Sequence, residues 1–120
     1  MKIAVTSKGK TLDSEVDPRF GRAEFILVVD SDTFEFEVID NSENRNAFKG
    51  AGIKAASDIS EHKAEVLLTG YCGPNAFTTL EAAEIKACDN VSGTIREAVE
   101  NFKNGKYKIL DAPNAEGQWV

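Results

Sequence analysis

The sequence has 120 residues, of which 42% are hydrophobic and 28% charged, and its formal net charge is −6. This length suits one domain with one core, and the composition is typical of a soluble globular protein. No apolar run approaches the ~18 residues of a membrane helix, and the negative charge makes nucleic acid an unfavourable partner. Residues 1–7 turn polar too early for a signal peptide, so we expect a cytoplasmic protein whose two cysteines stay reduced.

The first half of the chain predicts three strands and two long loops. Residues 2–6 and 24–30 are apolar runs, typical of strands that are buried on both faces. Residues 34–38 alternate apolar and acidic side chains, which predicts a half-exposed edge strand in a hairpin with the strand before it. Residues 7–23 and the polar stretch 41–49 show no helical or strand period, and a loop as long as 7–23 is usually functional or mobile.

The second half predicts helices that alternate with short strands. The expected elements are a helix from Ile53 to about residue 61, a strand over 65–69, a helix from Pro74, a strand over 85–88 and a helix over 95–102. Gly105 closes the last helix, and residues 106–110 can form an extended segment. We expect a single domain over residues 1–112 and a C-terminal tail over residues 113–120.

The order of elements predicts an α/β fold with a five-stranded mixed sheet. Two hairpin connections followed by right-handed crossovers give the strand order 3-2-1-4-5, with helices on both faces. This is the ribonuclease-H-like arrangement. The loops after strands 1, 3, 4 and 5 then meet at one edge of the sheet, where ligands of open α/β sheets usually bind.

The turn from Gly70 to Pro74 stands out at this edge. Proline suits the first position of a helix, and Gly73 is an acceptable N-cap, so the stretch predicts a strand, a tight turn and a helix N-terminus. Such a turn directs backbone N–H groups and the positive end of a helix dipole towards one small space, which favours an anion. We expect Cys72 to be exposed there, with a lowered pKa. The alternative is an ordinary turn that holds a chance cysteine.

Cys72 and Cys88 end neighbouring predicted strands at this edge. They could form a thiol pair or ligate a soft metal, although Cys88 could equally be a small buried hydrophobic residue. Arg19 and Arg22 flank Phe20-Gly21 on the long loop, where they could bind an oxyanion or be ordinary surface arginines. His62, the one histidine of the sequence, is expected at the opposite edge of the sheet.

Several short motifs together resemble a known family. They are Met1-Lys2-Ile3-Ala4-Val5, Arg19-Phe20-Gly21-Arg22-Ala23, Gly50-Ala51-Gly52, and Thr69-Gly70 with Gly73-Pro74-Asn75-Ala76-Phe77. Over roughly residues 1–110 the chain is similar to the dinitrogenase iron–molybdenum cofactor biosynthesis family. That family includes NifX-type carriers, the C-terminal part of NifB-type proteins, and the orange protein with its molybdenum–copper sulfide cluster.

The resemblance implies a ribonuclease-H-like domain that binds a metal–sulfur cluster, a precursor or a related anion without catalysis, with cofactor-assembly proteins as partners. The expected binding residues are Arg19, Phe20, Gly21, Arg22, Gly50, Gly52, Gly70, Cys72, Gly73 and Asn75, and the candidate metal ligands are Cys72 and Cys88. One alternative is a regulatory or protein-interaction domain without a cofactor. A remote alternative is a ribonuclease-H-like nuclease, but that chemistry needs carboxylates on the first strand, and Ile3-Ala4-Val5 offers none.

Overall fold

A computed structural model describes residues 1–46 and 50–111 of the chain. The strands are β1 (Lys2–Ser7), β2 (Phe25–Asp30), β3 (Phe36–Asp40), β4 (Val66–Leu68) and β5 (Lys86–Cys88). The helices are α1 (Ser42–Arg45), α2 (Ala51–Glu61), α3 (Pro74–Ala82) and α4 (Ile95–Lys103). None of these helices has the length and apolar character needed to span a bilayer.

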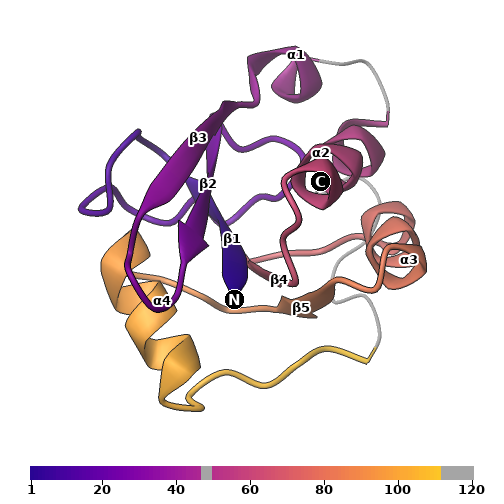
Figure 1. Ribbon diagram of the computed structural model, residues 1–120. Coiled ribbons are helices and arrows are strands. Elements are labelled where there is room, and N and C mark those ends of the chain that lie inside the picture. The colour runs from indigo at the N-terminus through magenta and orange to yellow at the C-terminus, as the bar shows by residue number, and fades with distance from the viewer. Residues whose placement is uncertain (47–49, 112–120) are drawn as a thin grey trace.

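The strands form one mixed sheet in the order β3-β2-β1-β4-β5, which confirms the predicted topology. β2 is antiparallel to both β1 and β3, whereas β4 and β5 run parallel to β1. α2 and α3 lie on one side of the sheet and α4 lies on the other (Figure 1). The carboxyl ends of β1, β3, β4 and β5 therefore share one edge, as expected.

Each face of the sheet has its own buried core, because side chains alternate along each strand. On the side of α2 and α3, Ala4, Ile26 and Leu67 pack against Ile59 and Leu80. The α4 side buries a second set, which includes Ile3, Val5, Leu27, Leu68, Ile95 and Val99. β1 and β4 carry apolar side chains on both faces, and the apolar runs Ile3-Ala4-Val5 and Val66-Leu67-Leu68 reflect this central position.

Two elements differ from the expectation. The third strand starts two residues later than predicted, because Phe34 has a positive φ of 62° and belongs to the turn. The Asp30 carboxylate accepts the backbone N–H groups of Asp32 (2.8 Å) and Thr33 (3.2 Å), which lengthens that turn. Part of the predicted polar loop after β3 is a short helix, α1. The predicted tail over residues 113–120 lies outside the described residues.

The long loop between β1 and β2 is well anchored. The N–H of Lys8 donates to the Glu15 carbonyl (2.9 Å), and that of Val16 donates to the Gly93 carbonyl (2.9 Å) before α4. Leu12 and Val16 are buried in the core on the α4 side. These contacts explain how a segment without helical or strand periodicity holds a fixed position at the carboxyl edge.

Candidate functional site

Three loops of the carboxyl edge pack directly on one another, and glycines make this possible. A Cβ on Gly21 would lie 2.5 Å from the backbone nitrogen of Gly52, and a Cβ on Gly70 would lie 2.7 Å from the backbone of Pro18. A Cβ on Gly52 would lie 2.9 Å from the Cβ of Ala76. The loop 17–22, the start of α2 and the turn before α3 are therefore in contact, as the topology predicts. The glycines of the motifs serve this close packing.

The N-termini of α2 and α3 meet at this point, and neither has a side-chain cap. Their N-cap residues are Gly50 and Gly73, which offer no side-chain acceptor. The first-turn N–H groups therefore have no capping side chain, and the positive ends of two helix dipoles lie close together.

α4 shows the opposite arrangement at its N-terminus. The hydroxyl of Thr94 accepts the N–H of Glu97 (3.1 Å), and the Glu97 carboxylate accepts the N–H of Thr94 (2.9 Å). This capping box closes the helix end, and the hydrogen bond from Thr94 lowers the pKa of the Glu97 carboxyl below its ordinary value. Among the three helices of nine or more residues, α2 and α3 thus begin without a side-chain cap, whereas α4 begins with a capping box.

Both predicted arginines lie on the loop 17–22 between β1 and β2, which packs against the start of α2 and the turn before α3. Arg19 forms a backbone bridge with Tyr71, and its Nε lies 3.5 Å from the buried carboxylate of Asp17. Its side chain is 49% exposed. Arg22 donates from Nη1 to the backbone carbonyl of Arg45 in α1 (2.8 Å). The loop therefore holds two guanidinium groups at the same edge as the helix N-termini.

Asn41, which was not predicted as a site residue, holds the loop between β1 and β2 through hydrogen bonds to its backbone. Its side-chain amide donates to the carbonyls of Gly21 (3.1 Å) and Ala23 (2.8 Å), and it is fully buried. Asn44 donates both to Asn41 (2.9 Å) and to Asp58 on α2 (2.8 Å). The sequence signal for this network is limited to the polar, Asn-rich stretch 41–46 after β3. Tyr71, 42% exposed at the edge, was also missed.

The predicted exposure of Cys72 is wrong. Its side chain is 0% exposed and packs in the core under α2 and α3. Because burial penalises the charged thiolate, the pKa of Cys72 rises from 9.0 to about 12 instead of falling. The turn places the backbone of Tyr71 against Pro18, with the Tyr71 N–H donating to the Pro18 carbonyl (2.7 Å). This contact puts Tyr71 at the surface and Cys72 inside.

Cys88 lies in the other core, on the α4 side of the sheet. It is 0% exposed, and burial together with the neighbouring Asp89 raises its pKa to about 11. The two thiols thus belong to cores on opposite faces, although Cys88 ends β5 and Cys72 lies in the turn after the neighbouring strand β4. Their roles as metal ligands stay predictions, and within the described residues no group of three His, Cys, Asp or Glu side chains could hold a metal ion.

The predicted binding residues divide into a surface set and a buried set. Arg19, Arg22, Gly50 and Asn75 are at least partly exposed. The buried residues are Phe20, Gly21, Gly52, Gly70, Cys72 and Gly73. Phe20 is a 0% exposed core side chain, so it anchors the loop that carries the arginines. Of the predicted side chains, only those of the surface set are exposed enough to contact a ligand directly.

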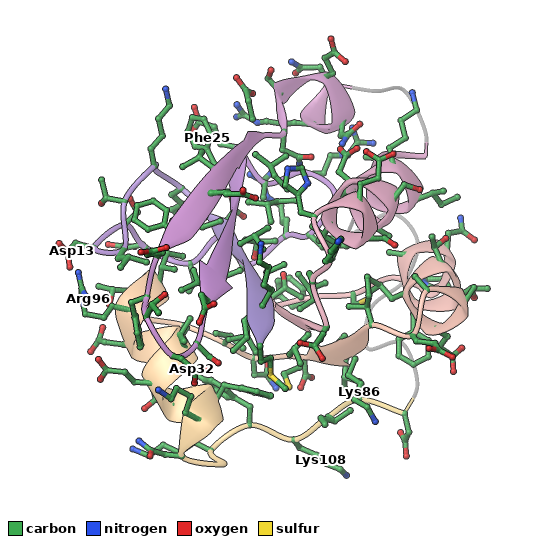
Figure 2. All side chains as sticks on the ribbon, in the orientation of Figure 1. Asp13, Phe25, Asp32, Lys86, Arg96 and Lys108 are labelled. Carbon is green, nitrogen blue, oxygen red and sulfur yellow. The ribbon has the colours of Figure 1, made fainter. Side chains whose placement is uncertain are left out.

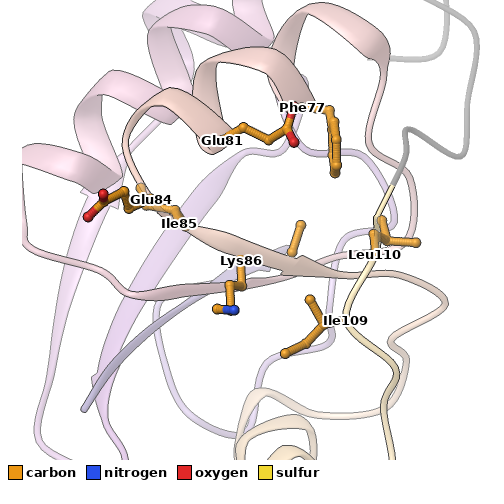
Figure 3. Close-up of a pocket in the computed structure, with 8 residues that line it drawn as sticks. Phe77, Glu81, Glu84, Ile85, Lys86, Ile109 and Leu110 are labelled. Carbon is orange, nitrogen blue, oxygen red and sulfur yellow. The ribbon is translucent and has the colours of Figure 1, made fainter.

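The edge offers hydrogen-bond donors and positive charge in a protein of net charge −6. It offers no paired carboxylates and no activated thiol among the residues named above. A separate hollow of about 320 Å³ lies between α3, β5 and Ile109-Leu110, and Glu81, Glu84 and Lys86 line its rim (Figure 3). The chemistry of the carboxyl edge suits binding of an anion.

Comparisons with known proteins agree with the fold. The apo form of the orange protein from Desulfovibrio gigas is 45% identical, with a TM-score of 0.92 over 95% of this chain and 96% of that chain. A NifB-type protein from Thermotoga is 34% identical, with a TM-score of 0.82 over 97% of this chain and 98% of that chain. A protein from Methanocaldococcus jannaschii is 15% identical with a TM-score of 0.70, over 94% and 97% of the two chains, and shows the fold alone. Comparison with curated proteins gives no significant match.

Family membership rests on the sequence profile as well as on these structures. Residues 1–105 match the profile of the family described as Dinitrogenase iron-molybdenum cofactor. This span covers every element from β1 to α4 and all of the loops that meet at the carboxyl edge. The chain belongs to the Dinitrogenase iron-molybdenum cofactor family.

Proposed function

We propose that the carboxyl edge binds an anionic metal–sulfur cluster, its precursor or a related anion as cargo, and that the chain is a non-catalytic carrier. The observation that carries this proposal is the contact between Gly52 and Ala76, which brings two helix N-termini without side-chain caps together. Arg19 and Arg22 lie on the loop packed against them. Helix N-termini and guanidinium groups are the usual partners of anions in proteins.

The donor set fits an anion better than a bare metal ion. Guanidinium and backbone N–H groups donate hydrogen bonds to sulfide or oxide ligands of a cluster, whereas a metal ion needs lone-pair donors. Cys72 is buried and neutral at pH 7, because its pKa is about 12. In this arrangement the cargo is held by charge and hydrogen bonds, with the exposed Asn75 and Tyr71 beside it. Thiolate ligation would require the turn to open.

Family membership indicates the class of cargo. The family is described by the iron–molybdenum cofactor of dinitrogenase, and one similar structure is a NifB-type protein. A carrier of such cargo would work in the cytoplasm and exchange its load with cofactor-assembly proteins. Surface binding at an exposed edge suits this role, since a carrier must release what it binds.

The test is reconstitution of the reduced protein with molybdate plus sulfide, or with iron plus sulfide, under anaerobic conditions. We expect a coloured complex of defined stoichiometry by visible absorption and elemental analysis. Arg19→Ala and Arg22→Ala should each raise the dissociation constant about tenfold, or about 1.4 kcal/mol, which is the scale of one charge-assisted hydrogen bond.

Arg96→Ala is a matched control. Arg96 lies on α4 with its Nε 3.5 Å from Asp13, and its side chain is 46% exposed, close to the values for Arg19 (Figure 2). It should leave binding unchanged. Equal loss in all three variants would mean that only net charge matters. Failure to retain metal in any condition would favour the alternative, a protein-interaction domain without a cofactor.

A further inference from the structure

Among the described residues, β3 pairs with a strand on one side only, β2, and is an open edge of the sheet. The N–H of Asp30 donates to the Glu35 carbonyl (2.8 Å), and the N–H of Asn41 donates to the Glu24 carbonyl (3.1 Å). In an antiparallel pair, residues alternate between facing the partner strand and facing away. The residues whose backbone groups point away from β2 are therefore Phe36, Val38 and Asp40.

The side chains of this edge divide cleanly between the two faces of the sheet. Phe36 and Val38 pair with Val29 and Leu27, so they lie on the α4 face, where they are 38% and 40% exposed. Glu37 points to the other face and is exposed. The edge thus presents two apolar side chains on one face and a carboxylate between them on the other.

The opposite end of the sheet has the complementary pattern. Residues 106–110, here called the outer segment, read Lys-Tyr-Lys-Ile-Leu. The N–H of Leu110 donates to the Ala87 carbonyl (2.8 Å), and Ile109 forms an antiparallel bridge with Cys88. The outer segment therefore covers part of β5 and runs antiparallel to it. By the same alternation, Tyr107 and Ile109 direct their backbone groups away from β5.

The outer segment also has its apolar side chains on the same face of the sheet as those of β3. Tyr107 packs against the core on the α4 side, and Ile109 shares that face because it pairs with Cys88. Lys108 lies on the opposite face and is exposed, and Ile109 is 42% exposed. Among the described residues, neither Lys108 nor Glu37 forms an ion pair that the structure shows. Figure 2 shows both Lys86 and Lys108 at the end of the sheet away from β3.

We propose that β3 of one molecule pairs antiparallel with the outer segment of a second copy of this chain. β3 runs parallel to β5, and the outer segment runs antiparallel to both, so simple extension of the sheet gives the antiparallel direction. In one register Phe36 lies opposite Ile109, Val38 opposite Tyr107 and Glu37 opposite Lys108. In this register the two strands run antiparallel and the apolar side chains face one another on the α4 face. The glutamate lies opposite the lysine on the other face.

Pairing of two β3 strands with each other is less favourable. The register that places Phe36 opposite Val38 of the other copy also places the two Glu37 carboxylates directly opposite one another. Like charges in directly opposed positions destabilise a sheet, and a charged edge strand is a common protection against such self-pairing. The asymmetric contact avoids this repulsion, because it places a lysine opposite the glutamate.

The asymmetric contact has two consequences. A joined pair keeps one free β3, on one molecule, and one free outer segment, on the other, so growth does not stop at a dimer. The interface is also small, since a single strand pair of about five residues falls well below the roughly 1,200 Å² of a stable complex. We therefore expect weak association that rises with protein concentration and falls with added salt.

Sedimentation equilibrium of the full chain over a concentration series, at low and at high salt, tests this proposal. The average mass should rise continuously with concentration. Glu37→Lys and Lys108→Glu should each weaken association about tenfold, because each places like charges opposite one another. Mixing the two variants in equal amounts should restore association, since each mixed contact then joins a lysine and a glutamate.

Glu100→Lys on α4 and Lys63→Glu after α2 make the same charge changes at exposed positions outside β3 and the outer segment. They should leave association unchanged, and circular dichroism should show that all four variants fold. A monomer at every concentration would overturn the proposal. So would association that saturates at a dimer, or charge reversals whose effects mixing does not reverse.

Discussion

Raising the pH above 9 should destabilise this protein through its buried thiols, and Cys72 carries the largest effect. Its pKa rises from 9.0 to about 12 because burial penalises the thiolate. Between these values the folded state holds a proton that the unfolded state has lost, so the free energy of unfolding falls as the pH rises. The slope is about 1.4 kcal/mol per pH unit, or about 2.7 kcal/mol between pH 9 and 11.

Urea unfolding at pH 8, 9, 10 and 11, in the presence of a reducing agent, measures this slope. Lysines and tyrosines titrate in the same range, so the comparison is between the wild type and Cys72→Ala. At pH 8 the variant should be less stable, because it leaves a small cavity. The difference should then shrink by about 1.4 kcal/mol per unit above pH 9, since the variant lacks the titrating thiol.

Val99→Ala supplies the control for cavity formation alone. Val99 is 0% exposed and does not titrate, so its destabilisation should be the same at every pH. Cys88→Ala should behave like Cys72→Ala up to about pH 11, where the Cys88 thiol itself ionises. If the difference between the wild type and Cys72→Ala is constant from pH 8 to 11, the thiol is not in an apolar environment and the turn is more open than described.

Three further changes test other parts of the structure. Gly21→Ala should destabilise the protein by about 1–3 kcal/mol in thermal melts, because its Cβ would meet the backbone of Gly52; an unchanged melting temperature would refute that close approach. Thr94→Ala should cost about 1 kcal/mol through loss of the capping box, whereas the exposed Thr78→Ala should change stability by less than about 0.5 kcal/mol in the same melts. His62→Ala should leave reconstitution with molybdate plus sulfide unchanged, because His62 follows α2 at the opposite edge; a tenfold loss would contradict the strand directions.

The sheet order could be predicted because it depends on patterns that lie within single elements. The apolar run of β2 predicted a buried strand, and the alternation after Phe34 predicted an edge strand. Pro74 marked the start of α3 because its chemistry is local. These signals need no knowledge of distant contacts.

The environment of Cys72 could not be predicted in the same way. Whether Tyr71 or Cys72 faces the solvent depends on the hydrogen bond between Tyr71 and Pro18, two residues from distant parts of the chain. Similarly, Asn41 looks like one polar residue of a loop, and its burial follows from carbonyls at Gly21 and Ala23 that the fold brings to it. The rule that thiols at helix N-termini ionise easily holds only for exposed thiols, and burial reverses it here.

The glycines of the family motifs serve the packing of the loops rather than direct contact with a ligand. If the glycines contacted a ligand directly, Gly21 and Gly52 would have open space where a Cβ would stand. The backbone of α2 fills that space at Gly21, and the side chain of Ala76 in α3 fills it at Gly52. The glycines instead let the loop 17–22 approach α2 closely, and this approach determines where Arg19 and Arg22 lie relative to the helix N-termini. A substitution at Gly21 should therefore weaken anion binding only to the extent that it displaces Arg19 and Arg22. A second substitution that restores the packing should restore binding, although it adds no contact with the ligand.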